Sequence, residues 1–163
     1  MTVTNEGLRI ELTESAKGTF FESGRPVLND DGRDIVAALA KVLGTIPNKV
    51  YVEGHTDAKP YTEGSSYTNW ELSTDRANTT RNLMQENGVR SDQITEVRGF
   101  AAMKLRKVSD PFDPSNRRIS LMVQYLELAA ANDSHEQLTK SLPNTQPAAE
   151  NSQPSSPPTP ANK

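Results

Sequence analysis

The stretch that decides the fold reads Val50-Tyr51-Val52-Glu53-Gly54-His55-Thr56-Asp57. Its two valines fall on one face of an extended chain, and the tyrosine, glutamate and histidine fall on the other. Such alternation indicates a β-strand with one apolar and one polar face. The following residues, from Thr56 to Tyr67, are rich in Thr, Ser, Gly, Pro and Tyr and have no period. A loop is therefore expected to leave the carboxyl end of this strand.

A helix is expected to follow that loop. Residues 68–71 fit a capping box, in which a threonine and a glutamate satisfy the backbone of the first helical turn. From Leu72 a stripe of helical spacing, which includes Arg76, continues to about residues 87–88. A strand followed by a crossover helix brings the end of the strand close to the start of the helix. Asp57 and the first two turns of this helix should therefore border one crevice.

The other periodic segments complete an α/β pattern. Residues 8–12 alternate as a strand, residues 35–43 carry apolar side chains at helical spacing, and residues 94–98 and 118–125 predict two further strands. The order is strand, helix, strand, helix, strand, strand, or βαβαββ. One-sided alternation predicts a two-layer α/β sandwich, in which a mixed β-sheet carries both helices on one face.

The distribution of proline divides the chain. Six of the eleven prolines lie after Leu142, where large apolar residues are almost absent. A segment of this composition cannot bury enough surface to offset its conformational entropy. We therefore expect one domain over residues 1–128 and a largely disordered tail over residues 129–163, whose start is compatible with a helix.

Charge and hydropathy exclude several classes of partner. The net charge is −3, whereas a nucleic-acid protein needs a clustered excess of Lys and Arg, so no nucleic-acid partner is expected. No apolar run approaches the roughly 20 residues of a membrane-spanning helix, and the first residues do not resemble a signal peptide. No membrane contact by this stretch of chain is expected.

An enzymatic hypothesis would take His55 and Asp57 as metal ligands or as a hydrolase pair. A catalytic zinc normally has three protein ligands, and the other histidine, His135, lies close to the predicted tail. The sequence also lacks a Gly-x-Ser-x-Gly motif, a phosphate-binding glycine loop and a dinucleotide fingerprint. We therefore expect no enzymatic activity, no cofactor and no metal.

Arg76 lies on the inward stripe of the second predicted helix, where a guanidinium needs an anionic partner. Two interpretations stay open. In the first, Asp57 and Arg76 form an internal salt bridge that holds the loop. In the second they bind a zwitterion, with the aspartate accepting from an ammonium group and the arginine holding a carboxylate. Asn69 either adds a hydrogen bond to such a ligand or caps the helix.

Three motifs carry a family resemblance. They are Gly54-His55-Thr56-Asp57, Asn69-x-x-Leu72-Ser73-x-x-Arg76-Ala77 and Asn116-Arg117-Arg118-Ile119. In this order they resemble the motifs of the OmpA-like peptidoglycan-binding domain, over a match that runs from about Glu6 to Tyr125. The run Asn69-Trp70-Glu71-Leu72-Ser73 and the long Gly-Ser insertion before it resemble the flagellar stator branch of that family, the MotB proteins.

The resemblance implies binding of diaminopimelate in the peptidoglycan stem peptide, because the side chain of that residue ends in both an ammonium and a carboxylate. Asp57 and Arg76 match the ligand pair of the family. Asn69 and Leu72 match positions that line the same pocket. The expected peptidoglycan-binding set is completed by an arginine of the third motif.

That arginine is either Arg117 or Arg118. Strand alternation places Arg117 on the same face as Ile119 and Arg118 on the other face, so only one of the two should point at the site. Of the two we expect Arg118 to do so.

The resemblance also implies a biological setting. It predicts non-catalytic anchoring of a flagellar motor stator complex to the cell wall by the periplasmic domain of an inner-membrane protein. It further implies a homodimer and an ion-channel partner subunit, which would contact an N-terminal region absent from this chain. The first alternative is a tether that joins an outer-membrane protein or lipoprotein to peptidoglycan. A metal-dependent cell-wall hydrolase is a less favoured alternative.

Overall fold

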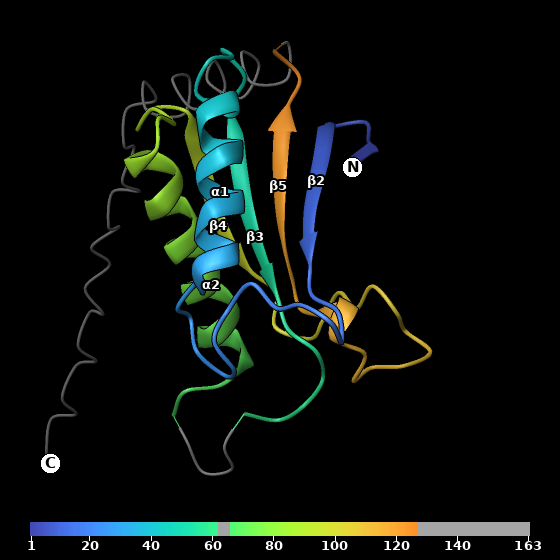
Figure 1. Cartoon of the computed structure of the whole chain (residues 1–163). Helices are drawn as coiled ribbons and strands as arrows, with labels where there is room; N and C mark the ends of the chain where they lie inside the picture. The colour runs from blue at the N-terminus through green and yellow to red at the C-terminus, as the bar shows by residue number, and fades with distance from the viewer. Residues whose placement is uncertain (62–65, 127–163) are drawn as a thin grey trace, which may run out of the picture.

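The computed structural model describes residues 1–61 and 66–126, and within them a mixed five-stranded sheet carries two helices (Figure 1). The sheet order is β1-β2-β5-β3-β4, with β3 and β4 parallel and the other neighbours antiparallel. The predicted tail over residues 129–163 lies outside the described residues. The elements are β1 (Thr2–Val3), β2 (Gly7–Thr13), α1 (Asp30–Leu43), β3 (Val50–His55), α2 (Asn69–Glu86), β4 (Ile94–Gly99), the short 3-10 helix η1 (Pro114–Asn116) and β5 (Arg118–Gln124).

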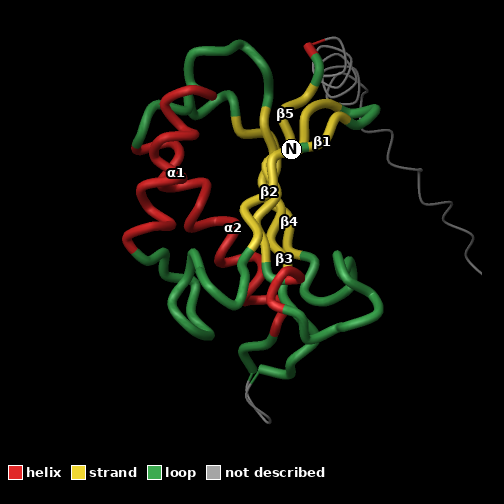
Figure 2. The backbone as a smooth tube through the Cα atoms, turned by 45° about the vertical axis from the view of Figure 1, so that its right-hand side comes forward, coloured by secondary structure: helices red, strands yellow, loops and turns green. Residues whose placement is uncertain are grey.

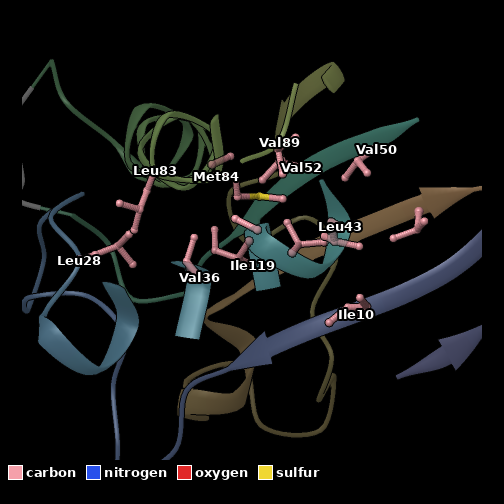
Figure 3. Close-up of a cluster of buried hydrophobic side chains, with 14 of the residues drawn as sticks. Ile10, Leu28, Val36, Leu43, Val50, Val52, Leu83, Met84, Val89 and Ile119 are labelled. Atoms are coloured by element: carbon pink, nitrogen blue, oxygen red, sulfur yellow. The ribbon is translucent and has the colours of Figure 1, made fainter. Parts of the chain in front are cut away.

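Both helices pack on the same face of the sheet, which confirms the predicted two-layer α/β sandwich (Figure 2). The core lies between the layers, where apolar side chains of α1 and α2 meet those of the central strands (Figure 3). Val36 of α1, Met84 of α2 and Val52 of β3 are almost fully buried there. The valines of the sequence stretch quoted first thus point at the helices, as their alternation predicts.

Local side-chain contacts fix where the helices begin. Asn29 caps α1 by accepting a hydrogen bond from the backbone N–H of Gly32. Thr68 and Glu71 form the predicted capping box of α2, so that two backbone N–H groups at the helix start are satisfied. The start of α2 beside the loop after β3 is therefore well defined.

Two elements were not predicted because each is too short to show a period. The strand β1 has two residues and pairs with β2 at the sheet edge. The 3-10 helix η1 has three residues, and its start is held by Asp113, whose side chain accepts from the backbone N–H of Ser115. Neither element changes the predicted order of the longer helices and strands.

A glycine lets α2 approach β3 very closely. A Cβ atom added at Gly54 would lie 1.9 Å from the carbonyl oxygen of Ser73, which is backbone of the helix. Ser73 also accepts a hydrogen bond from the backbone N–H of Ala101, which ties the helix to the end of β4. This close packing fixes the distance between the end of β3 and the first turns of α2.

The sheet face away from the helices is covered by polar and aromatic side chains. Tyr51, Glu53 and His55 are all at least 96% buried on this face. The guanidinium of Arg98 lies 4.2 Å from the centre of the Tyr51 ring, and Phe100 stacks on His55 at 5.2 Å. None of the helices in residues 1–61 and 66–126 combines the length and the apolar character needed to cross a membrane.

Candidate functional site

A cavity of about 390 Å³ lies at the carboxyl end of β3. Its walls come from the loop after β2, the residues just after β3, the first two turns of α2 and the residue before β5. These segments gather at the lower end of the sheet in Figure 1. The cavity is lined by Glu14, Thr19, Phe21, Ser23, Gly24, Thr56, Asp57, Lys59, Pro60, Tyr61, Asn69, Leu72, Arg76 and Arg117.

Asp57 belongs to a chain of ion pairs on one wall of this cavity. Its Oδ2 lies 2.6 Å from Nη1 of Arg117, and the Nε of Arg117 lies 2.6 Å from Oε2 of Glu14. Desolvation opposes the charge on Arg117, but its hydrogen bonds to Glu14 and Asp57 outweigh that effect and raise the pKa of Arg117. The carboxylate of Asp57 is thus held in place by an arginine while it faces the cavity.

Arg76 also lines the cavity and is only 4% exposed. Its Nε donates to the carbonyl of Arg25 at 3.1 Å, its Nη2 donates to the carbonyl of Glu22 at 3.5 Å, and its guanidinium lies 4.7 Å from the centre of the Phe21 ring. Burial lowers the pKa of Arg76, and the carboxylate of Glu14 opposes this effect. An arginine retains its charge at neutral pH even so.

The internal salt bridge between Asp57 and Arg76, the first of the two interpretations, does not form. Among residues 1–61 and 66–126, no ion pair within 4.0 Å includes Arg76, and Asp57 pairs with Arg117 instead. Two hydrogen bonds to carbonyl groups partly satisfy the buried guanidinium, and no carboxylate of the described residues lies within ion-pair distance of it. The site therefore presents one unpaired cation near one anion whose charge is already partly balanced.

Asn69 and Leu72 both line the cavity, in different ways. Asn69 donates from Nδ2 to the carbonyl oxygens of Lys59, at 2.8 Å, and of Asp57, at 3.4 Å. It does not cap the helix, since Thr68 does. Leu72 is 5% exposed and supplies an apolar wall. The structure thus brings together four of the expected residues, with Asn69 holding the loop that carries the aspartate.

The choice between the two arginines of the third motif was wrong. Arg118 points away from the cavity, where its Nε donates to Glu11 and its Nη2 donates to the carbonyl of Lys104. Arg117 faces the cavity because it shares the face of Ile119, and that face is the one that the helices cover. The predicted alternation of the two side chains is correct, but the site lies on the helix side of the sheet.

Among the lining residues that were not predicted from the sequence, Glu14 and Thr56 are the two that are both buried and polar. Glu14 directly follows β2, and its position becomes clear only from the antiparallel pairing of β2 with β5, which places it beside Arg117. Thr56 is 2% exposed, lines the cavity, and its Oγ1 has no hydrogen-bond partner among the described residues. A buried hydroxyl without a partner is costly, so a polar ligand group would relieve that cost.

His55 lies on the opposite face of β3 from the cavity and is 2% exposed. Its Nε2 lies 3.8 Å from Oε2 of Glu53, which is beyond hydrogen-bond distance, and neither ring nitrogen has a hydrogen-bond partner among residues 1–61 and 66–126. No group of three or more potential metal-binding side chains occurs in that part of the chain. His55 is therefore packed beneath Phe100 and takes no part in the cavity.

Acid should destabilise the fold through His55. Burial lowers the pKa of His55, the charges of Arg118 and Lys104 on neighbouring segments act in the same direction, and Glu53 opposes them. Because the unfolded chain then binds more protons than the folded one, folding stability falls as pH drops below about 6.5. We expect the free energy of unfolding to fall less between about pH 7 and pH 5 in His55→Gln than in the wild type.

Urea denaturation at a series of pH values measures this difference. The range stops at about pH 5 because the pKa of Glu53 is lowered and its own contribution is lost only in stronger acid. His135→Gln, which alters the other histidine of the chain, is the matched control and should behave as the wild type. Parallel pH profiles for His55→Gln and the wild type would show that His55 does not cause the acid sensitivity.

The fold and the cavity together define an α/β domain with a cavity at the carboxyl end of β3, lined by acidic and basic side chains. The model of the OmpA family matches residues 20–120, which is more than half of the chain. The chain belongs to the OmpA family.

Two relatives with the same protein name are similar over most of this chain. Motility protein B of Escherichia coli strain K12 is 42% identical over 122 residues, which are 74% of this chain and 40% of the relative. Motility protein B of Bacillus subtilis strain 168 is 25% identical over 134 residues, which are 80% of this chain and 50% of the relative. The chain spans half or less of the length of these two relatives.

Solved structures share the fold at low sequence identity. The periplasmic domain of Helicobacter pylori MotB has a TM-score of 0.62 and 16% identity, over 84% of this chain and 97% of that one. The cell wall anchor of the T6SS from Pseudomonas aeruginosa has a TM-score of 0.58 and 23% identity, over 71% of this chain and 81% of that one. At this level of sequence identity, the similarity shows a shared arrangement of helices and strands and nothing beyond it.

Proposed function

We propose that this chain binds the stem peptide of peptidoglycan without cutting it, and that the ligand group is the zwitterionic end of diaminopimelate. The main support for the proposal comes from the environment of Arg76. Its guanidinium is buried in the cavity wall and has no carboxylate partner among the described residues. A ligand carboxylate would supply the ion-pair contact that Arg76 lacks. Membership in the OmpA family supports the same ligand class.

The donor geometry of Arg76 suits a carboxylate. Its Nε and Nη2 already donate to carbonyl groups, while Nη1 has no acceptor among the described residues. A guanidinium can also share its N–H groups between two acceptors, and a ligand carboxylate accepts strongly because the hydrogen bond is charge-assisted. The ligand carboxylate would therefore compete well with the weaker contact to Glu22, which is 3.5 Å long.

The ammonium group would contact Asp57. In the free site its Oδ1 accepts from the backbone N–H of Lys59 at 3.1 Å, and its Oδ2 accepts from Arg117 at 2.6 Å. Each carboxylate oxygen has two lone pairs, so both oxygens retain capacity for a further donor. Leu72 would contact the methylene chain between the ligand's charged end and the rest of the stem peptide.

The biological setting that we propose is a stator anchor. A relative that is 42% identical over three quarters of this chain is called Motility protein B, and a protein of the same fold is described as a cell wall anchor. In this setting residues 1–128 form the periplasmic peptidoglycan-binding domain of an inner-membrane protein, which acts as a homodimer with an ion-channel partner subunit. A tether for an outer-membrane protein would use the same pocket, and an outer membrane protein from Borrelia burgdorferi shares the fold.

The expected affinity of one pocket is modest. Two or three charge-assisted hydrogen bonds contribute roughly 1.5–3 kcal/mol each, and association and ordering costs oppose them, which leaves a Kd of about millimolar to tens of micromolar. Two pockets of a dimer on a polymer that repeats its ligand would gain effective concentration. Dimerisation would then strengthen the attachment without any new contact in the pocket.

Sedimentation with purified insoluble cell wall tests the proposal. The wild type should pellet with the wall, and Asp57→Asn should remain in the supernatant because the ammonium loses its anionic partner. Asp92→Asn is the matched control, since its side chain is 64% exposed and lies before β4, at the end of the sheet opposite the cavity. Circular dichroism establishes that each variant is folded. Undiminished pelleting of folded Asp57→Asn would place the binding site elsewhere.

A further inference from the structure

Glu14 is a buried acid that the proposed ligand contacts do not use. It is 4% exposed and lines the cavity. Its Oε2 pairs with Arg117 at 2.6 Å, and its Oε1 accepts from the backbone N–H groups of Phe20 at 3.3 Å and Phe21 at 3.4 Å. Its carboxylate is therefore held in place by three separate donors, all on segments that form the cavity wall.

The buried and half-buried charges of the cavity balance. Glu14 and Asp57 each carry one negative charge, and Arg76 and Arg117 each carry one positive charge, so this set of four sums to zero. Lys59 also lines the cavity but is exposed, so solvent screens its charge. Without Glu14 the same set would carry one net positive charge.

The negative charge of Glu14 also acts on Arg76, the residue that is proposed to bind the ligand carboxylate. Glu14 is the strongest charged influence on the pKa of Arg76 and raises it, ahead of Asp57. Glu14 is thus the common counter-charge of both arginines, although it forms an ion pair with only one of them. A group in this position weakens the attraction of the cavity for any anion and leaves its attraction for a neutral zwitterion almost unchanged.

We infer that Glu14 determines the selectivity of the cavity for zwitterions over simple carboxylates, because it balances the charge of the second arginine. The inference rests on the proposed function and deepens it by assigning the rejection of anions to one residue. Two arginines with a single acid would form a general carboxylate site. With Glu14 present, a ligand carboxylate binds with a favourable free energy only if an ammonium group beside it contacts Asp57.

The test compares ligands that differ only in charged groups. Diaminopimelate is the zwitterionic probe, pimelate has the same carbon chain without the ammonium groups, and 1,5-diaminopentane has it without the carboxylates. The measured quantity is the ratio of the Kd for pimelate to the Kd for diaminopimelate, obtained by titration followed by NMR. Glu14→Gln retains an oxygen that accepts from the backbone of Phe20 and Phe21, and it removes the charge.

The charge balance predicts that the ratio of the two Kd values shifts in opposite directions in the two single variants. In the double variant the ratio should return towards the wild-type value. In Glu14→Gln the ratio should fall about tenfold, which corresponds to about 1.4 kcal/mol, because the anion is now attracted. In Arg117→Gln the ratio should rise and 1,5-diaminopentane should bind more tightly than to the wild type. In the double variant, whose cavity is again neutral, the ratio should return to within about threefold of the wild-type value.

Each outcome has a distinct meaning. If the wild type does not bind diaminopimelate, the proposed function fails and the inference fails with it. If the wild type binds but Glu14→Gln weakens both ligands equally, Glu14 has only a structural role and the inference is overturned while the function stands. If Glu14→Gln does not fold, the opposite shift in Arg117→Gln and the reversal in the double variant decide the question, and the absence of both overturns the inference.

Discussion

Arg76→Met is expected to lower the affinity for a diaminopimelate-bearing stem peptide by about 100-fold or more while the protein stays folded. The ligand carboxylate would lose one or two charge-assisted hydrogen bonds, each worth roughly 1.5–3 kcal/mol. Methionine has a similar volume and retains the contact with Phe21. Because a buried guanidinium without a carboxylate partner costs stability, the free energy of unfolding should be unchanged or higher in the variant.

Calorimetric titration and urea denaturation measure these two effects. Arg76→Lys retains the charge but loses the planar fork of donors, so its affinity should lie between those of the wild type and Arg76→Met. Arg33→Met makes the same change at an exposed position on α1 and should alter neither quantity. An Arg76→Met protein that binds as the wild type does, or that unfolds, would mean that the guanidinium serves the fold and not the ligand.

Gly54→Ala is expected to lower the free energy of unfolding by about 3 kcal/mol, the upper part of the range for overpacked cores. Its added methyl group would lie 1.9 Å from the carbonyl oxygen of Ser73. Neither β3 nor α2 can move away at low cost, because both belong to the packed core. The same displacement would change the separation of Asp57 and Arg76, so the affinity for the stem peptide should also fall.

Gly18→Ala is the matched control for this substitution. A Cβ atom added at Gly18 has no heavy atom within 4 Å, so the denaturation midpoint should stay close to that of the wild type. Equal stability of Gly54→Ala and Gly18→Ala in urea denaturation would show that α2 does not need the close approach at Gly54.

The sequence predicted well those features that depend on periodicity along one segment. The alternation of the stretch from Val50 to His55 predicted the bounds of β3, and the stripe through Arg76 predicted that this arginine points inward. The capping box at Thr68 predicted the start of α2. These features are local, because each depends on contacts within a few residues along the chain.

The features that sequence reasoning missed depend on pairing between distant segments. Arg117 and Arg118 alternate as predicted, but which of them meets Asp57 depends on which sheet face the helices cover. Glu14 lies beside Arg117 only because β2 runs antiparallel to β5 in one register. A single sequence contains no direct signal for either arrangement, since both follow from the assembled sheet.

In the proposed function, Asp57 and Arg76 bind the two charged groups of one zwitterion. The most direct measurement is a titration with two stem peptides that differ only in their third residue, which is diaminopimelate in one and lysine in the other. Lysine retains the ammonium group and lacks the carboxylate that Arg76 would hold. We predict that the diaminopimelate peptide binds at least about tenfold more tightly, because the lysine peptide loses one charge-assisted hydrogen bond. Equal affinity for the two peptides would show that Arg76 does not bind a carboxylate of the ligand.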